Sequence, residues 1–140
     1  MASTSAKDSA VKLFTDGGAR GNPGPAAIGG VLYDGQKKLG EFSIYIGETT
    51  NNQAEYKAIE EGLRLAWKNN ISDLKCYLDS ELVVKQLNKE YRVKDKDLAK
   101  IFVKVWNLSL KFKSIKFYHI RRELNKEADK LVNNALDSRS

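Results

Sequence analysis

The order of hydrophobic and polar positions divides the chain into strand-like and helix-like segments. Alternation of apolar and polar residues predicts three opening strands, over residues 11–16, 26–33 and 39–46. Asp34-Gly35 is a typical hairpin turn, and the glycine- and proline-rich segment 17–25 is expected to be a loop. Three consecutive strands with short links form an antiparallel meander.

The period then changes from two to between three and four residues, which indicates helices. The first helix is expected over residues 52–69, and the elements after it are a strand at 74–79, a short helix at 80–87, a charged connector at 88–95, a helix at 96–110, a strand at 115–120 and a final helix capped by Asn125. Helical crossovers make the later strands parallel to a neighbour. The pattern therefore predicts an α/β fold with a mixed sheet covered by helices.

Size and charge narrow the function. The 140 residues fit one domain over 11–140, preceded by a small polar segment, 1–10, that we expect to be a flexible tail. The single cysteine, Cys76, excludes an internal disulfide and fits a reducing compartment, so we expect a cytoplasmic protein. No apolar run approaches the roughly 20 residues of a membrane span. The net charge of +6 favours a polyanionic partner.

Four acidic residues stand at positions where a sheet of this kind places its ligands. Asp16 and Asp79 each end an apolar strand, while Glu55 and Asp129 lie near the start of predicted helices. Each has an ordinary structural role open to it, as a turn former, a helix cap or a partner of the helix dipole. If they converge, the four carboxylates repel one another unless divalent cations bind. Hard oxygen ligands suit magnesium or manganese, and two such ions suit phosphodiester cleavage.

The four acids lie in the motifs TDGGARGNPGP, TTNNQAE, LDSELVV and NKEADKL, which together resemble ribonuclease H of type 1. The resemblance runs from Val11 to Leu136. It implies the ribonuclease H fold, a five-stranded mixed sheet in the order 3-2-1-4-5 flanked by helices. It also implies hydrolysis of the RNA strand of RNA–DNA hybrids, which leaves 5′-phosphate and 3′-hydroxyl ends.

By the same resemblance, Asp16, Glu55, Asp79 and Asp129 would be the catalytic metal ligands. They would hold two Mg²⁺ ions, with Mn²⁺ as a substitute, and Asp16 would bridge both. One ion would position the attacking water, and the other would stabilise the leaving 3′ oxygen.

The resemblance also implies a set of substrate contacts, namely Gly17, Asn22, Thr50, Asn51, Asn52, Gln53, Ser80 and Glu81. Many relatives carry a histidine in the loop before the last helix that aids product release. Here that loop is short, and Arg121 or Arg122 is the candidate replacement, since His119 lies within the strand. The connector 88–95 is too short for the basic helix with which several members grip the hybrid.

Other interpretations stay open at this point. The chain could be a binding module that has lost catalysis, or another nuclease of the same fold. Such a nuclease would be an exonuclease or a junction resolvase. Exonucleases of this fold usually place Asp-x-Glu on the first strand, where this chain has Asp16-Gly17-Gly18. A nucleotide-binding domain is disfavoured because the glycine-rich loop has no phosphate-loop lysine. Double-stranded RNA is a further candidate substrate, and we expect a monomer.

Overall fold

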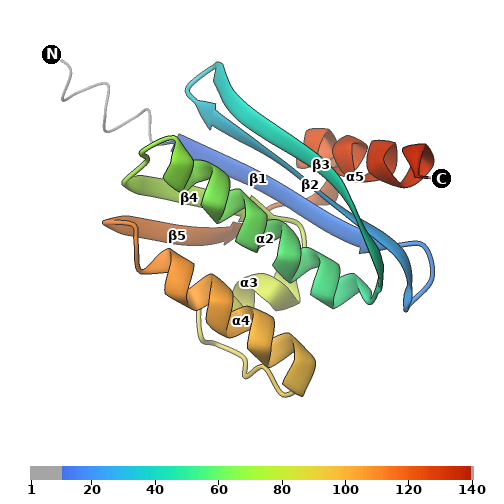
Figure 1. The fold of residues 1–140 in the computed structure, drawn as a ribbon. Coiled ribbons are helices and arrows are strands. Elements are labelled where there is room, and N and C mark those ends of the chain that lie inside the picture. The colour runs from blue at the N-terminus through green and yellow to red at the C-terminus, as the bar shows by residue number, and fades with distance from the viewer. Residues whose placement is uncertain (1–10, 140) are drawn as a thin grey trace, which may run out of the picture.

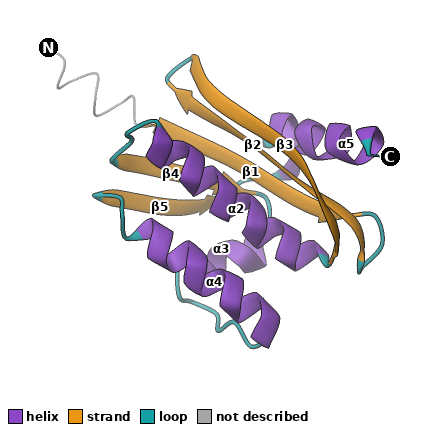
Figure 2. Ribbon diagram, in the orientation of Figure 1, coloured by secondary structure: helices purple, strands orange, loops and turns teal. Residues whose placement is uncertain are grey.

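We describe residues 11–139 of a computed structural model of the chain (Figures 1 and 2). The strands are β1 Val11–Ala19, β2 Gly24–Asp34, β3 Lys37–Thr49, β4 Asp73–Leu78 and β5 Ser114–His119. The helices are α2 Asn51–Lys68, α3 Glu81–Leu87, α4 Lys96–Ser109 and α5 Lys126–Ser138, with a 3-10 turn η1 at Arg122–Leu124. The expected N-terminal tail lies outside the described residues.

The five strands form one mixed sheet in the order β3-β2-β1-β4-β5, as expected. The pairs β1–β2 and β2–β3 are antiparallel, whereas β1–β4 and β4–β5 are parallel. The longest strands lie at the meander side, and the parallel strands β4 and β5 are shorter. Pairing of β1 with β4 ends at Phe14 and Tyr77, so β1 continues past the end of its neighbour.

Helices cover the two faces of the sheet unequally (Figure 1). α2, α3 and α4 lie on one face and enclose the main core, in which Leu13, Tyr56, Ile59 and Leu63 are fully buried. On the opposite face α5 packs across β1, β2 and β3, and its residues Val132 and Leu136 belong to one buried apolar cluster with Ala27. Among residues 11–139, no helix is long and apolar enough to cross a membrane.

The expectation of a loop over 17–25 was mostly wrong. β1 runs on to Ala19 and β2 begins at Gly24, so only four residues connect them. The glycines that suggest a loop locally are held in the ladder, since Gly17 pairs with Ile28 and Gly18 with Ala27. Strand pairing therefore overrides the weak strand propensity of glycine.

Candidate active site

The site lies where β1 extends beyond the end of β4. Asp16 is two residues past the last β1–β4 pair, and Asp79 directly follows the last residue of β4. Glu55 comes from the second turn of α2, on the other face of the sheet. Because no strand of the described part of the chain flanks β1 on this side after Phe14, side chains from both faces can meet at its open edge.

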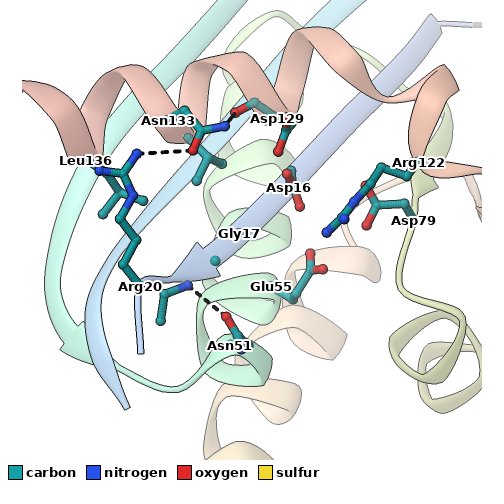
Figure 3. A pocket seen from close by; sticks show the side chains of 13 residues that line it. Asp16, Gly17, Arg20, Asn51, Glu55, Asp79, Arg122, Asp129, Asn133 and Leu136 are labelled. Atoms are coloured by element: carbon teal, nitrogen blue, oxygen red, sulfur yellow. Dashed lines mark hydrogen bonds between the residues drawn. The ribbon is translucent and has the colours of Figure 1, made fainter. Parts of the chain in front are cut away.

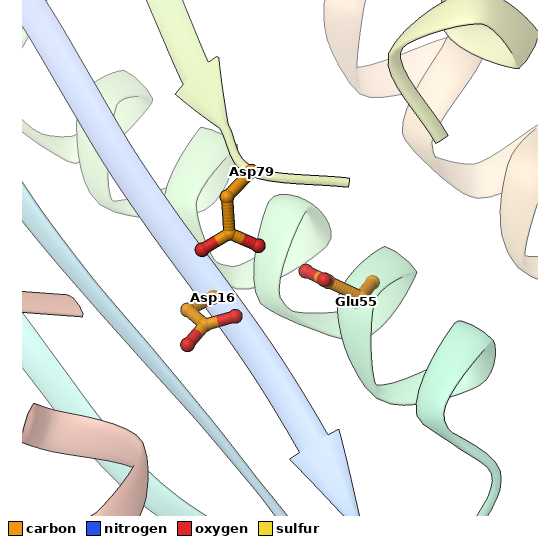
Figure 4. A group of neighbouring side chains, drawn as sticks. All are labelled: Asp16, Glu55 and Asp79. Atoms are coloured by element: carbon orange, nitrogen blue, oxygen red, sulfur yellow. The ribbon is translucent and has the colours of Figure 1, made fainter. Parts of the chain in front are cut away.

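Three of the four predicted acids form a tight cluster (Figure 4). Carboxylate oxygens of Asp16, Glu55 and Asp79 all lie within 4.8 Å of one another. Asp16 and Glu55 are each only 8% exposed. The predicted convergence of these three acids is confirmed.

Asp129 lies just outside this cluster and lines the same cleft, which has a volume of about 330 Å³ (Figure 3). It projects from the first turn of α5 toward Asp16. The opposite side of the cleft carries Arg122, whose guanidinium points toward Glu55 and Asp79 (Figure 3). The cleft thus combines four carboxylates with a cation at its rim.

Crowding of negative charge changes how these groups bind protons. Burial, followed by the charges of Asp79 and Asp129, raises the pKa of Asp16 from 3.8 to about 8. Burial, followed by the charges of Asp16 and Asp79, also raises the pKa of Glu55 well above its usual value. The positive charge of Arg122 opposes this rise at Glu55. Without a cation, the cluster resists full ionisation near neutral pH.

The donor set fits a divalent cation. One oxygen of Glu55, Oε1, is buried and has no hydrogen-bond partner within residues 11–139. Leaving a buried acceptor unpaired costs free energy, and a bound ion would satisfy it. Carboxylate oxygens are the ligands that Mg²⁺, Mn²⁺ and Ca²⁺ share. The triad could therefore hold metal ions.

Two glycines allow the helices to bring their acids this close. A Cβ on Gly17 would lie 2.2 Å from the carbonyl oxygen of Ala54, in the helix turn that carries Glu55. On the other face, a Cβ on Gly29 would lie 2.7 Å from the carbonyl oxygen of Ala128 in α5. Gly29 is also the register partner of Asp16. Glycine at these positions sets the approach of α2 and α5 to the sheet.

Comparison with known proteins places this geometry in a family. The sequence profile of the family described as "Reverse transcriptase-like" matches residues 14–135. The crystal structure of RNase H1 from the halophilic archaeon Halobacterium salinarum superposes with a TM-score of 0.89 at 40% identity, covering 92% of this chain and 98% of that one. The chain belongs to the type 1 ribonuclease H family.

Other members share the likeness. LC11-RNase H1, whose crystal structure contains an RNA/DNA hybrid, superposes with a TM-score of 0.85 at 43% identity, covering 91% of this chain and 96% of that one. A Mycobacterium tuberculosis relative, "Bifunctional protein Rv2228c", is 39% identical over 130 residues. This match takes in 91% of the chain but only 36% of that relative, so the ribonuclease H chain described here spans about a third of its length.

In this ribonuclease H chain, Asn125 contributes to the site in a way that sequence reasoning missed. It is the N-cap residue of α5, as predicted, but within residues 11–139 its side chain makes no capping hydrogen bond. Instead its Nδ2 donates to the carbonyl oxygen of Thr15 at 2.9 Å and to Oδ2 of Asp79 at 3.2 Å. Both hydrogens of one amide thereby join β1, Asp79 and α5.

Hydrogen bonds connect the predicted substrate residues at the start of α2 with Asn22 and with the end of β1. Asn22 Oδ1 accepts from the backbone N–H of Asn51, whose own Oδ1 accepts from the N–H of Ala19. The Thr50 hydroxyl caps α2 by accepting from the N–H of Gln53. These residues line one polar groove, formed by Asn22, Thr50, Asn51, Asn52, Gln53, Asp95, Asp97 and Leu98. Asn51 also lines the carboxylate cleft, so groove and cleft adjoin.

Of the other predicted substrate-binding residues, two have structural partners and one lines the carboxylate cleft. Ser80 caps α3, and Glu81 pairs with Lys85 on the helix surface at 3.3 Å, so both have structural partners. Gly17 lines the carboxylate cleft.

The two arginines predicted to aid product release, Arg121 and Arg122, lie in different places. Arg122 lines the cleft, whereas Arg121 does not and pairs with Glu123 at 2.7 Å. Arg20, in the motif TDGGARGNPGP, also lines the cleft, although the motif alone does not single it out. It is held by Asn133 at 3.3 Å and Asp137 at 2.8 Å.

Proposed function

We propose that this chain is an endoribonuclease that hydrolyses the RNA strand of RNA–DNA hybrids with the aid of Mg²⁺. The observation that carries the proposal is the meeting of Asp16, Glu55 and Asp79 within 4.8 Å, beside a polar groove. A binding module without catalysis is the alternative. It is disfavoured because selection for binding alone gives no reason to keep mutually repelling, buried carboxylates together.

The residues have distinct roles in this proposal. Asp16, Glu55, Asp79 and Asp129 would hold the metal ions. When bound there, divalent cations supply Lewis-acid charge stabilisation to phosphodiester hydrolysis. Arg122, at the rim beside Glu55, is placed to attract a phosphate of the substrate or the product.

The polar groove supports the choice of substrate. Its amides and hydroxyl can hydrogen-bond to sugar and base edges of a minor groove, where the 2′-hydroxyl distinguishes RNA from DNA. We infer that Asn22, Thr50 and Asn52 contact the hybrid there. Their groove adjoins the cleft through Asn51, so a strand bound along it leads to the carboxylates.

Cleavage of labelled RNA tests the proposal. The same labelled RNA strand is offered in a hybrid, in an RNA duplex and alone, with Mg²⁺, with Mn²⁺ or with a chelator. We expect internal cuts in the hybrid that need metal and leave 5′-phosphate ends. An absence of metal-dependent cutting, from a protein shown to be folded, contradicts the proposal.

A matched pair of acids in α5 sharpens the test. Asp129→Asn should lower cleavage by on the order of 10²–10³-fold, the scale seen on losing one preorganised electrostatic group. Glu127→Gln is the control, because Glu127 lies on another side of the helix and binds Tyr33 at 2.6 Å and Lys38 at 2.7 Å. It should retain activity.

A further inference from the structure

Three aromatic rings stand in one row across the open part of the sheet. Phe14 on β1 is the register partner of Tyr77 on β4, which in turn pairs with Tyr118 on β5. Phe14 and Tyr77 stack with ring centroids 5.1 Å apart, and Tyr77 and Tyr118 stack at 5.3 Å. The stack crosses three strands as a continuous column of rings.

The column is closed at one end and open at the other. On β2, Val31 is the register partner of Phe14 and shares a small apolar pocket with it. At the far end β5 is the edge strand of the sheet that residues 11–139 form, so within that range no further strand follows Tyr118. Tyr118 is 36% exposed. A flat, aromatic ligand could therefore extend the column at Tyr118.

A row of lysines runs beside the rings. Lys12, Lys75 and Lys116 are register partners of one another on β1, β4 and β5, each two residues before a ring of the column. Alternation along the strands places them on the same face as the rings. Lys12 Nζ lies 5.8 Å from the centroid of the Tyr77 ring.

Repulsion among the three lysines destabilises the sheet, and an anionic ligand would reduce this repulsion. Like charges directly opposite one another destabilise a sheet. Within residues 11–139, no ion pair involves any of these three lysines, and the nearest acid along this face of β4 is Asp73, next to the row. At the lysine row itself, three cations therefore stand against one carboxylate, while Asp16 and Asp79 lie four residues further along the chain from Lys12 and Lys75.

We propose that this sheet platform, formed by Lys12, Phe14, Lys75, Tyr77, Lys116 and Tyr118, binds single-stranded nucleic acid. An unpaired base adds to the column at Tyr118, and the lysines contact the phosphates. Stacking requires a base with a free face, which selects a single strand over a duplex. Asp16 and Asp79 lie two residues beyond Phe14 and Tyr77, so a strand on the platform runs beside the cleft. The proposal does not depend on hydrolysis.

Fluorescence anisotropy of the full chain with a short labelled oligothymidylate, in chelator, tests the platform. DNA is used so that binding is measured apart from any cleavage of RNA. Tyr118→Ala and Tyr118→Leu should each weaken binding by about 5- to 100-fold, while Tyr118→Phe binds like the original protein. Lys116→Ala should reduce the slope of log affinity against log salt by about 0.7.

Matched controls lie on the other edge strand, β3. Tyr45 is similarly exposed at 42%, and Lys37 is likewise an exposed lysine, so Tyr45→Ala and Lys37→Ala should bind like the original protein. The proposal is overturned if the oligothymidylate does not bind at low salt, or if Tyr118 and Lys116 variants match their controls. It is also overturned if a blunt DNA duplex or an acidic peptide competes as well as unlabelled oligothymidylate.

Discussion

Replacing Asp16 by asparagine should stabilise the metal-free protein, and the gain should depend on pH. The pKa of Asp16 is raised from 3.8 to about 8 by burial and by the charges of Asp79 and Asp129. Between these two pH values the folded protein retains a proton that the unfolded chain has released. Stability conferred by this proton is fully present below about pH 4 and is lost as pH rises through about 8.

The pKa shift sets a ceiling on the effect. The rise in the pKa of Asp16 from 3.8 to about 8 corresponds to at most about 6 kcal/mol of unfolding free energy. The cleft is open to water, which relaxes around the charge, so we expect a gain of about 2–4 kcal/mol for Asp16→Asn at pH 9. At pH 4 the two proteins should agree within roughly 0.5 kcal/mol.

Urea unfolding in chelator at pH 4, 7 and 9, followed by circular dichroism, measures the difference. Adding Mg²⁺ at pH 9 should then stabilise the original protein more than the variant, because ligand binding adds to the stability of the folded state. Asp34→Asn is the control, since Asp34 is exposed at the β2–β3 turn and Asn-Gly suits that turn equally well. An equal gain at pH 4 and pH 9, or no gain at pH 9, would refute the reasoning.

Two further substitutions test how the cluster is held together. Gly17→Ala places a Cβ 2.2 Å from the backbone of α2, so cleavage should fall sharply and the free energy of unfolding should fall by about 1–3 kcal/mol. Gly18→Ala is the control, because its Cβ would lie 4.0 Å from the nearest atom, Oδ1 of Asn51. It should be tolerated in the same cleavage and urea assays. Asn125→Leu removes the hydrogen bonds to Asp79 and to the carbonyl oxygen of Thr15 without changing the charge, and it should weaken Mn²⁺ binding, measured by calorimetry on the substrate-free protein. The control is Asn88→Leu, which loses the hydrogen bond from its side-chain amide to the carbonyl oxygen of Phe117, outside the lining of the cleft. It should leave metal affinity unchanged, and equal effects of the two substitutions would contradict a positioning role for Asn125.

Local patterns were enough to predict most elements and the acids of the site. The alternation of β1, the helical period of α2 and the turn at Asp34-Gly35 arise from neighbours in sequence, so the chain itself records them. The ends of β1 and β2 were not predictable in this way. Their hydrogen bonds are made with each other, and glycine carries no side chain to signal a strand.

Contacts between remote segments explain what sequence reasoning missed. Asn125 bonds to Thr15, which is 110 positions away, and its position before α5 makes a helix cap the natural expectation. Arg121 and Arg122 are equivalent in sequence, and only the path of η1 directs one of them to the cleft. The ring and lysine rows likewise depend on the register of three strands, which no single strand reveals.

The arrangement of the site implies that its metal affinity and its stability are linked. Gly17 and Gly29 let helices approach both faces of the sheet, and that approach forces Glu55 and Asp129 toward Asp16. A fold with larger residues there would separate the acids and lose the repulsion. The chain instead retains buried carboxylates whose pKa values are raised. A cation must displace protons from them in order to bind, which lowers its net binding free energy. Metal affinity should therefore rise with pH up to at least about 8, over the range in which Asp16 loses its proton.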